Sequence, residues 1–423
     1  MSQKRIRGLA LVSALLIVVL LAALAGAQEA PQAAQYDIVA TGLFSPRHLD
    51  FATDGALYVA EAGSGGDTCV GGGTGQSSRC IGATGAVTVV DSGVQEQLVD
   101  DLTSLALEDG SDTTGPHDIA WDAEGNLMVI LGLGMDPAMR DPAGPFGPLV
   151  ENLGQLVQVA ADGTWTNEID IAAYEAAENP DGGEIDSNPY AIERVDGGYL
   201  VADAGANALL HVADDGTITT VAVFPPRMVE DPFSPGDMIP MQAVPTSVDV
   251  GPDGAIYVGQ LTGFPFPVGG ANVYRIEEGE EPEVYASGFT NIVDIAFAED
   301  GTLYVVEITS NGLLANNPNG SLIRVSADGS QAVLADKLFM PGGVAIGEDG
   351  SLYVTTWAAQ GNGMGQVLRI DAQFMSYMPF LPVPGPATPL KLCGSTMRQS
   401  MFCLLYTSPS PRDRTRSRMP SSA

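Results

Sequence analysis

The fold is decided by the stretch Pro46-Arg-His-Leu-Asp-Phe-Ala-Thr-Asp-Gly55-Ala-Leu-Tyr-Val-Ala-Glu61. Apolar residues lie on both sides of Asp54-Gly55, and the glycine can adopt the positive φ that a tight turn between two strands requires. The stretch therefore predicts two antiparallel strands joined by a hairpin turn.

This pattern recurs along the chain and gives six copies in all. The other five begin at Pro116, Pro189, Pro245, Ile292 and Pro341. A third apolar segment follows every copy, and a fourth follows several of them, as in residues 218–224 and 332–335. Four antiparallel strands per repeat are typical of a β-propeller blade. The sequence therefore predicts an all-β fold, a six-bladed β-propeller over residues 28–370.

The last copy lacks a fourth strand, because its pattern stops near Ile370. Residues 36–41 resemble the fourth strands of other copies, such as Glu283-Val-Tyr-Ala286. We therefore expect the N-terminal strand to complete the last blade, which would close the ring and remove its open edges.

The N-terminal segment has the composition of an export signal. Residues 1–27 contain a basic start, an apolar run over Leu9–Leu24 and the small residues Ala25-Gly26-Ala27. They predict a cleaved signal peptide and a secreted or extracytoplasmic protein, with an uncleaved anchor as the alternative. No other segment is long and apolar enough to span a membrane.

The C-terminal segment differs from the rest of the chain. Residues 371–390 form a Pro-rich apolar tail, and residues 391–423 resemble translated sequencing-adapter sequence, with a basic disordered tail as the alternative. Without residues 1–27 and 391–423, the chain has nine basic and 51 acidic residues, a net charge of −42. Such a surface repels nucleic acid and anionic membranes and suits divalent cations, although solubility alone can explain it.

Two cysteines lie within the propeller. Cys69 and Cys80 flank a Gly-rich loop, and outside the cytoplasm a local disulfide is expected. A metal site is not expected there, because no second cysteine pair or nearby histidine completes it.

The connections between strands predict two different faces. The Asp-Gly turns share one face, which we call the turn face; the long insertions share the opposite one, where the chain enters each blade, which we call the loop face. The insertions are residues 62–84, 132–153, 171–187, 225–243, 261–270 and 308–319. An Ala-Ala-Tyr-Glu-Ala-Ala run in 171–187 favours a short helix. Loops gathered on one side of a rigid scaffold commonly carry binding, although they also vary without function.

Polar residues gather where the central channel should meet the loop face. Glu61, Asp118, Asp203 and Glu307 are candidate ligands for Ca²⁺ or Mg²⁺, which bind carboxylate oxygens. His48 and His117 are candidate general acids or bases. Asp294, Gln260, Phe264 and Phe266 are candidate ligand-binding residues. The alternatives are a solvated acidic funnel, structural histidines and a loop tip that packs on its neighbour.

Several loop segments are similar to the ScyD/ScyE family of exported bacterial propeller proteins. They are Glu61-Ala-Gly-Ser-Gly-Gly66, Thr114-Gly-Pro-His-Asp-Ile119, Asp186-Ser-Asn-Pro-Tyr190, Tyr257-Val-Gly-Gln-Leu-Thr-Gly-Phe-Pro-Phe-Pro-Val268 and Gly288-Phe-Thr-Asn-Ile292. The resemblance implies a propeller and export, but supplies no catalytic set. More distantly, the blades resemble NHL repeats, gluconolactonase-type propellers and streptogramin lyase, which include metal-dependent enzymes.

Two classes of function remain open. The favoured one is a binding or scaffold module for a small molecule, a glycan or an envelope protein. The other is a metal-dependent hydrolase, lyase or lactonase at the channel mouth. The enzyme hypothesis requires the oxygens of Glu61, Asp203 and Glu307 to meet at one ion.

Overall fold

The computed structural model describes residues 36–71, 77–277 and 279–371. The predicted signal peptide and the two predicted C-terminal segments lie outside these ranges, apart from Asp371. Within the ranges, no helix has both the length and the apolar composition that crossing a bilayer requires.

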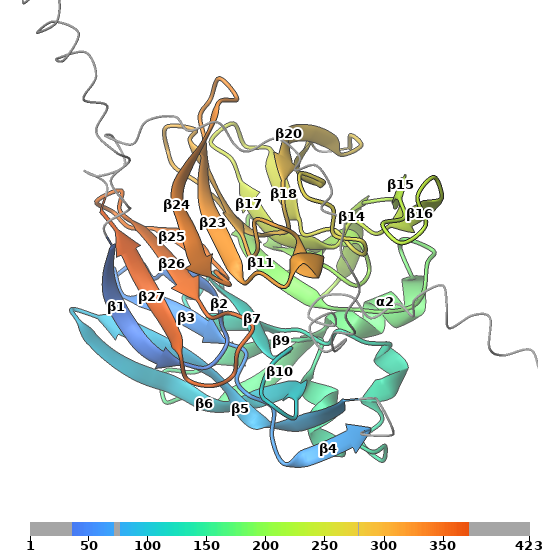
Figure 1. Ribbon diagram of the computed structural model, residues 1–423. Helices are drawn as coiled ribbons and strands as arrows, with labels where there is room; N and C mark the ends of the chain where they lie inside the picture. Colours follow the sequence, from blue (N-terminus) through green and yellow to red (C-terminus); the bar gives the residue numbers. More distant parts are fainter. Residues whose placement is uncertain (1–35, 72–76, 278, 372–423) are drawn as a thin grey trace, which may run out of the picture.

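Six antiparallel sheets form the six predicted blades (Figure 1). The first blade contains β2 (Pro46–Phe51), β3 (Leu57–Glu61), β5 (Ser78–Asp91) and β6 (Val94–Leu107), and β4 (Thr68–Gly71) pairs with β5. The second blade contains β7 (Pro116–Trp121), β8 (Leu127–Leu131), β9 (Gln155–Val159) and β10 (Trp165–Asp170). The third blade contains β11 (Pro189–Val195), β12 (Gly198–Asp203), β13 (Ala208–Ala213) and β14 (Ile218–Val223). The fourth blade contains β17 (Pro245–Val250), β18 (Ile256–Gln260), β19 (Ala271–Ile276) and β20 (Glu283–Phe289). The fifth blade contains β21 (Ile292–Phe297), β22 (Leu303–Glu307), β23 (Asn319–Val325) and β24 (Gln331–Phe339). The sixth blade contains β25 (Val344–Ile346), β26 (Leu352–Thr356), β27 (Gly365–Ile370) and β1 (Tyr36–Leu43).

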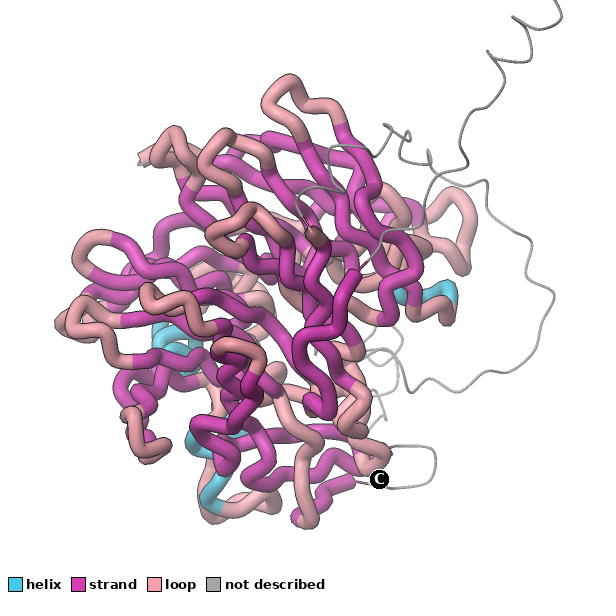
Figure 2. Tube along the Cα trace, turned by 90° about the vertical axis from the view of Figure 1, so that its left-hand side faces the viewer, coloured by secondary structure: helices cyan, strands magenta, loops and turns pink. Residues whose placement is uncertain are grey.

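The first strands of neighbouring blades surround the axis. β2 contacts β7, and contacts continue through β11, β17, β21 and β25 back to β2. The ring is therefore closed, and strands dominate the fold, as Figure 2 shows.

The N-terminal strand completes the sixth blade, as predicted. β1 pairs antiparallel with β27, with Tyr36 opposite Ile370 and Asp37 opposite Arg369. The last blade therefore contains strands from both ends of the described chain.

The repeated turns also form as expected. Gly55 has φ +87°, and the equivalent Gly254 has φ +79°. A side chain at either position would meet no atom within 4 Å, so glycine is required for its backbone conformation and not for lack of space.

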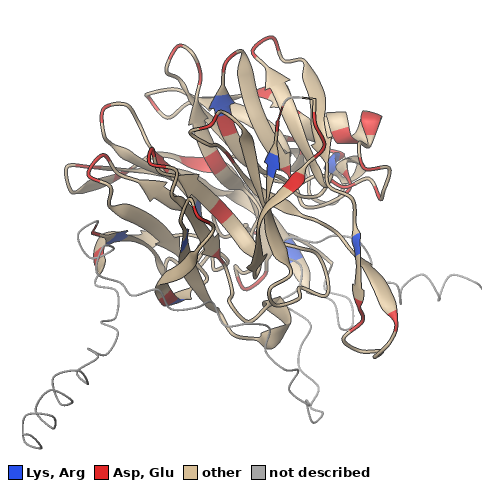
Figure 3. Cartoon of the chain, turned by 90° about the horizontal axis from the view of Figure 1, so that it is seen from above, with Lys and Arg blue, Asp and Glu red and all other residues tan. Residues whose placement is uncertain are grey.

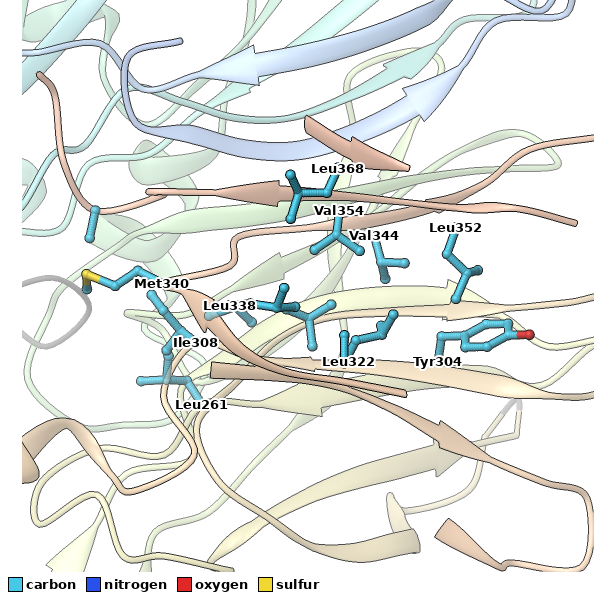
Figure 4. Packing of buried hydrophobic residues seen from close by; sticks show 14 of the residues in the cluster. Leu261, Tyr304, Ile308, Leu322, Leu338, Met340, Val344, Leu352, Val354 and Leu368 are labelled. Atoms are coloured by element: carbon cyan, nitrogen blue, oxygen red, sulfur yellow. The ribbon is translucent and has the colours of Figure 1, made fainter. Parts of the chain in front are cut away.

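The hydrophobic core lies between adjacent blades. Figure 4 shows Leu322 of the fifth blade packed with Val344, Leu352, Val354 and Leu368 of the sixth. Burying a side chain of this size contributes roughly 1.5–3 kcal/mol. This packing fixes the positions from which the inner strands face the axis.

The insertions form a second layer on the loop face. They contain α2 (Ile171–Glu178), the 3-10 helices η1 (Pro137–Arg140), η2 (Pro148–Asn152) and η3 (Leu313–Ala315), and a separate hairpin of β15 (Arg227–Glu230) and β16 (Met238–Met241). Several insertions share one apolar cluster, in which Ile81, Leu133, Phe146 and Ala172 meet. The predicted disulfide joins Cys69 of β4 to Cys80 of β5.

Candidate functional site

His48 lies at the centre of the ring and is 3% exposed. Its Nδ1 is 3.1 Å from Oδ2 of Asp118, and its Nε2 is 3.0 Å from the carbonyl oxygen of Val293. Nε2 is also 3.8 Å from Oδ1 of Asp294. Because both ring nitrogens face oxygens that only accept hydrogen bonds, the arrangement favours the doubly protonated imidazolium. One side chain therefore links the first, second and fifth blades.

The charges around His48 shift its titration and that of Asp294. Burial lowers the pKa of His48, but Asp294 and Asp118 outweigh it and raise the pKa to about 9. Burial raises the pKa of Asp294 to about 7, with Asp118 adding to the rise and His48 opposing it. His48 is therefore a cation at neutral pH, held between two acids.

The two carboxylates also join neighbouring blades. Asp118 accepts a hydrogen bond from the backbone N–H of Ile192 in the next blade, at 2.8 Å. Asp294 accepts one from the N–H of Val344, also at 2.8 Å. The inner strands are sheet edges, so these N–H groups have no partner from a further strand of their own sheet. The carboxylates replace that partner.

Three further acids follow the same inner strands: Asp50, Glu193 and Asp249. Each lies two residues beyond His48 or its equivalent, and alternate residues of a strand point to the same side. Asp249 accepts a hydrogen bond from Phe297 of the next blade at 2.7 Å. Our sequence analysis missed these acids, although the two-residue period of each first strand could have revealed them.

These channel acids resist losing their protons. Burial raises the pKa of Asp249 to about 6. Burial, followed by repulsion from Asp249 and Asp50, raises the pKa of Glu193 well above its ordinary value. Burial also raises the pKa of Asp50, to about 7, although part of this residue is exposed to solvent. Figure 3 shows that acidic residues far outnumber basic ones in the described part of the chain.

On the loop face, packed side chains fill the centre of the ring. Arg47 and Tyr190 are fully buried, and Nη1 of Arg47 lies 3.2 Å from the Tyr190 hydroxyl. Nη2 of Arg47 donates to the carbonyl oxygen of Thr113. The His117 ring lies against Tyr190, with 4.5 Å between centroids. These contacts close the centre of the loop face, where the sequence predicted a polar and acidic channel mouth and left open whether the channel is plugged.

His117 has the surroundings of a structural histidine. Its Nδ1 is 3.2 Å from the carbonyl oxygen of Pro189, and the side chain is 1% exposed. Burial and the nearby Arg47 charge lower its pKa well below the usual value. The neutral ring, with its proton on Nδ1, fits the contact with Pro189, while the buried Nε2 has no hydrogen-bond partner among the described residues.

The four predicted metal ligands do not meet. Glu61, Asp203 and Glu307 each accept a backbone N–H from the segment that enters their own blade, from Phe44, Asn188 and Thr290 respectively. Each also accepts a hydroxyl, from Thr88, Ser187 and Ser321 respectively. Asp118 instead pairs with His48. In the described part of the chain, no three His, Cys, Asp or Glu side chains have the spacing of a metal site.

Gln260 repeats this structural role in the fourth blade. Its Nε2 donates to the carbonyl oxygen of Ala243 at 3.2 Å, and its Oε1 accepts from the Tyr274 hydroxyl at 3.0 Å. In four of the six blades, the second strand therefore ends in a side chain that fixes the loop before the first strand, whether that side chain is an acid or an amide.

The apolar loop tip packs on its neighbours. Phe266 is 4% exposed, and half-buried Phe264 stacks on Phe233 of the 225–243 insertion, with 6.1 Å between ring centroids. Phe233 itself is 63% exposed. Sequence reasoning therefore identified the supporting rings and missed the exposed one.

Comparison with known proteins adds fold likeness alone. No family model and no curated protein matches the chain. A streptogramin B lyase structure is 13% identical with a TM-score of 0.44, and the match covers 79% of this chain and 96% of the other. A virginiamycin B lyase from Staphylococcus aureus is 12% identical with a TM-score of 0.43, covering 79% and 97%. A gluconolactonase from Xanthomonas campestris is 10% identical with a TM-score of 0.46, covering 80% and 90%.

At these levels, the similarities carry no argument about activity. The neighbours are propellers of the gluconolactonase and virginiamycin B lyase type. The narrower resemblance to the ScyD/ScyE family is not confirmed and stays a prediction.

Proposed function

We propose that this chain is an exported binding or scaffold module that recognises a protein partner through the loop face, at the β15–β16 hairpin. The observation that carries the proposal is an apolar surface on the side of this hairpin that faces solvent. Export itself rests on residues 1–27, and N-terminal sequencing of secreted protein would test it.

The hairpin has two faces that can be separated by register. Arg227 pairs with Met241 and Val229 with Ile239, and this face turns toward the body, because Met241 is buried and Val229 and Ile239 are half-buried. The opposite face should be polar if it only met water.

The opposite face instead exposes apolar side chains. Met228 is paired with Pro240, and Glu230 with Met238. Met228 is 58% exposed and Met238 is 54% exposed, and Phe233 extends the surface at the hairpin tip. Methionine and aromatic side chains are enriched in protein interfaces, and methionine adapts to irregular partners. We call Met228, Phe233 and Met238 the hairpin patch.

The charged residues around the hairpin patch indicate the charge of the partner that it would bind. Glu230, Asp231 and Asp237 lie on the hairpin, and Arg227 bonds to Gly270 and Gln260. An acidic rim around an apolar centre fits a protein segment with apolar side chains flanked by Lys or Arg. A second copy of this chain would bring two acidic rims together.

The hairpin patch can be tested with a defined probe. A fluorescent peptide of alternating Leu and Lys should bind the purified protein, and a Leu-Glu peptide should not. Changing Met228, Phe233 and Met238 to Ser should weaken binding at least tenfold, since each change removes roughly 1 kcal/mol or more of apolar contact. Fluorescence anisotropy measures the affinity of each peptide for the wild type and for the triple variant.

The control is Val94→Ser, which alters a 57%-exposed apolar side chain at a turn between β5 and β6. Equal binding by the triple variant and the wild type would contradict the proposal. Equal binding of the two peptides would contradict the charge argument. Binding of zwitterionic lipid vesicles, lost in the triple variant, would replace the protein partner with a membrane.

The metal-dependent hydrolase, lyase or lactonase remains the second candidate, because His48 lies between two carboxylates near the ring axis. It predicts bound Ca²⁺ or Mg²⁺ in the purified protein, and an activity that His48→Gln abolishes. Elemental analysis and activity of the wild type and of His48→Gln, before and after EDTA treatment and with the hairpin-patch assay run alongside, separate the two functions, because only a metal at the channel would be lost with His48.

A further inference from the structure

Glu175 is a buried acid whose charge nothing in its surroundings balances. It lies on α2 and is 1% exposed, and its carboxylate oxygens make no hydrogen bond of ordinary length, although the backbone N–H of Asp186 lies close enough to favour the charged form. A buried carboxylate left in this state costs several kcal/mol. Such a group is stable only if it takes up a proton or a cation.

The helix places Glu175 beside an irregular loop. Asp170 begins α2 by accepting a hydrogen bond from Ala173, and Asn179 ends it in the left-handed conformation, with φ +41°. Oδ1 of Asn179 is also buried without a partner in the described structure. Three buried oxygen atoms at this helix end, two of Glu175 and one of Asn179, therefore make no hydrogen bond of ordinary length among the described residues.

The surroundings of Glu175 are acidic. Burial raises its pKa to about 8, and the nearby carboxylates of Asp203, Asp181 and Asp186 add to the rise. Asp203 is satisfied by Ser187, Asn188, Gly205 and Ala206. Asp181 accepts from the N–H of Gly183 and the side chain of Asn207. No Lys or Arg side chain forms an ion pair with Glu175 in the described ranges.

We propose that Glu175 and Asn179, with the carboxylate of Asp181 and main-chain oxygens of the loop that follows it, form a site for one hard divalent cation, with Ca²⁺ preferred. The cation would neutralise Glu175 and supply its two oxygens with a partner. Calcium accepts six to eight oxygens from carboxylates, amides and main-chain carbonyls in flexible geometry, which suits an irregular loop better than the strict octahedron of Mg²⁺.

This site differs from the predicted ligand set at the channel. The described acids form no ready group of three at metal spacing, so amide and main-chain oxygens must complete the shell, with small movements of the loop. Binding would also fix the loop that leads into Ser187 and Asn188, which Asp203 anchors at the start of the third blade.

The experiment is calorimetric titration of EDTA-treated full-length protein with CaCl₂, and separately with MgCl₂, accompanied by thermal melts. We expect one equivalent of Ca²⁺ to bind more tightly than Mg²⁺ and to raise Tm. Glu175→Gln should weaken Ca²⁺ binding at least tenfold. Glu178→Gln is the matched control, because it removes an exposed acid from the same helix, and should change nothing.

Asp181→Asn provides a second variant and should also weaken binding, with the Glu175 carboxylate left in place. The inference is overturned if the wild type shows neither heat nor a Tm shift with Ca²⁺, or if Glu175→Gln and Asp181→Asn both bind Ca²⁺ as the wild type does. It is also overturned if Glu175 only holds a proton: stability would then fall between about pH 4.5 and about pH 8, equally with and without Ca²⁺.

Discussion

The acids near the ring axis and Glu175 on the loop face are all withdrawn from water, but they differ in what surrounds them. Asp118 and Asp294 accept backbone hydrogen bonds and face the His48 cation. Glu175 has no cation and no hydrogen bond of ordinary length among the described residues, with the backbone N–H of Asp186 as a nearby donor. Burial alone therefore does not tell a structural acid from a ligand; the partners of its oxygens do.

The largest expected effect on stability comes from a substitution at the ring axis. Asp118→Asn removes the charge beside buried His48 and should lower the free energy of unfolding by about 3–5 kcal/mol. Urea unfolding at neutral pH measures it. The exposed Asp67→Asn should change stability by less than about 0.5 kcal/mol. Equal effects of the two changes would show that the His48 contact contributes nothing.

Stability should decrease with rising pH. Asp249 and Asp294 have folded pKa values of about 6 and about 7, above the ordinary 3.8, so the folded chain holds protons that the unfolded chain releases. His48, at about 9, adds stability that is present below its ordinary 6.5 and is lost through pH 9. All three shifts raise the folded pKa, so each of the three groups makes the protein less stable as the pH rises.

The loss between pH 5 and pH 9 should be on the order of 2–4 kcal/mol, because the three groups are coupled and one pKa unit corresponds to about 1.4 kcal/mol. Urea unfolding at several pH values in EDTA measures it. A stability maximum above pH 8 would contradict the assignment of His48 as a buried cation.

The smallest expected effect is a gain. In EDTA at pH 9, Glu175→Gln should raise the free energy of unfolding by about 1 kcal/mol, because it removes an unbalanced buried charge. Glu178→Gln should leave it unchanged. A loss of stability in Glu175→Gln without metal would mean that this acid has a stabilising partner, and the contrast with the axis would disappear.

The architecture could be predicted from the sequence because it depends on local, repeated signals. The Asp54-Gly55 turn and its copies defined the blades, and the unmatched strand at residues 36–41 indicated the closure. The same holds for the Cys69–Cys80 disulfide and for the short helix near Tyr174. These features need only neighbouring residues or the count of strands.

The site could not be predicted to the same extent, because its chemistry depends on partners distant in the chain. Glu61 and Asp203 were selected as acids at the ends of second strands, but their oxygens serve backbone amides nearby. His48 was selected as a candidate general acid or base at the channel, whereas its contact with Val293, 245 positions away in the chain, could not be foreseen. The exposure of Met228 and Phe233 depends on how the 225–243 insertion folds, and no repeat or alternation of apolar residues in the sequence predicts it.

The pairing of β1 with β27 has a consequence for how the molecule is made. Until residues 365–370 have been synthesised, β1 has no neighbour in its sheet, and the sixth blade lacks its third strand. The sixth blade therefore cannot be completed on a growing chain, whatever the state of the earlier blades. Every nascent chain carries an unfinished last blade until its final strand is available, and a molecule that loses those six residues keeps β26 as an unpaired edge.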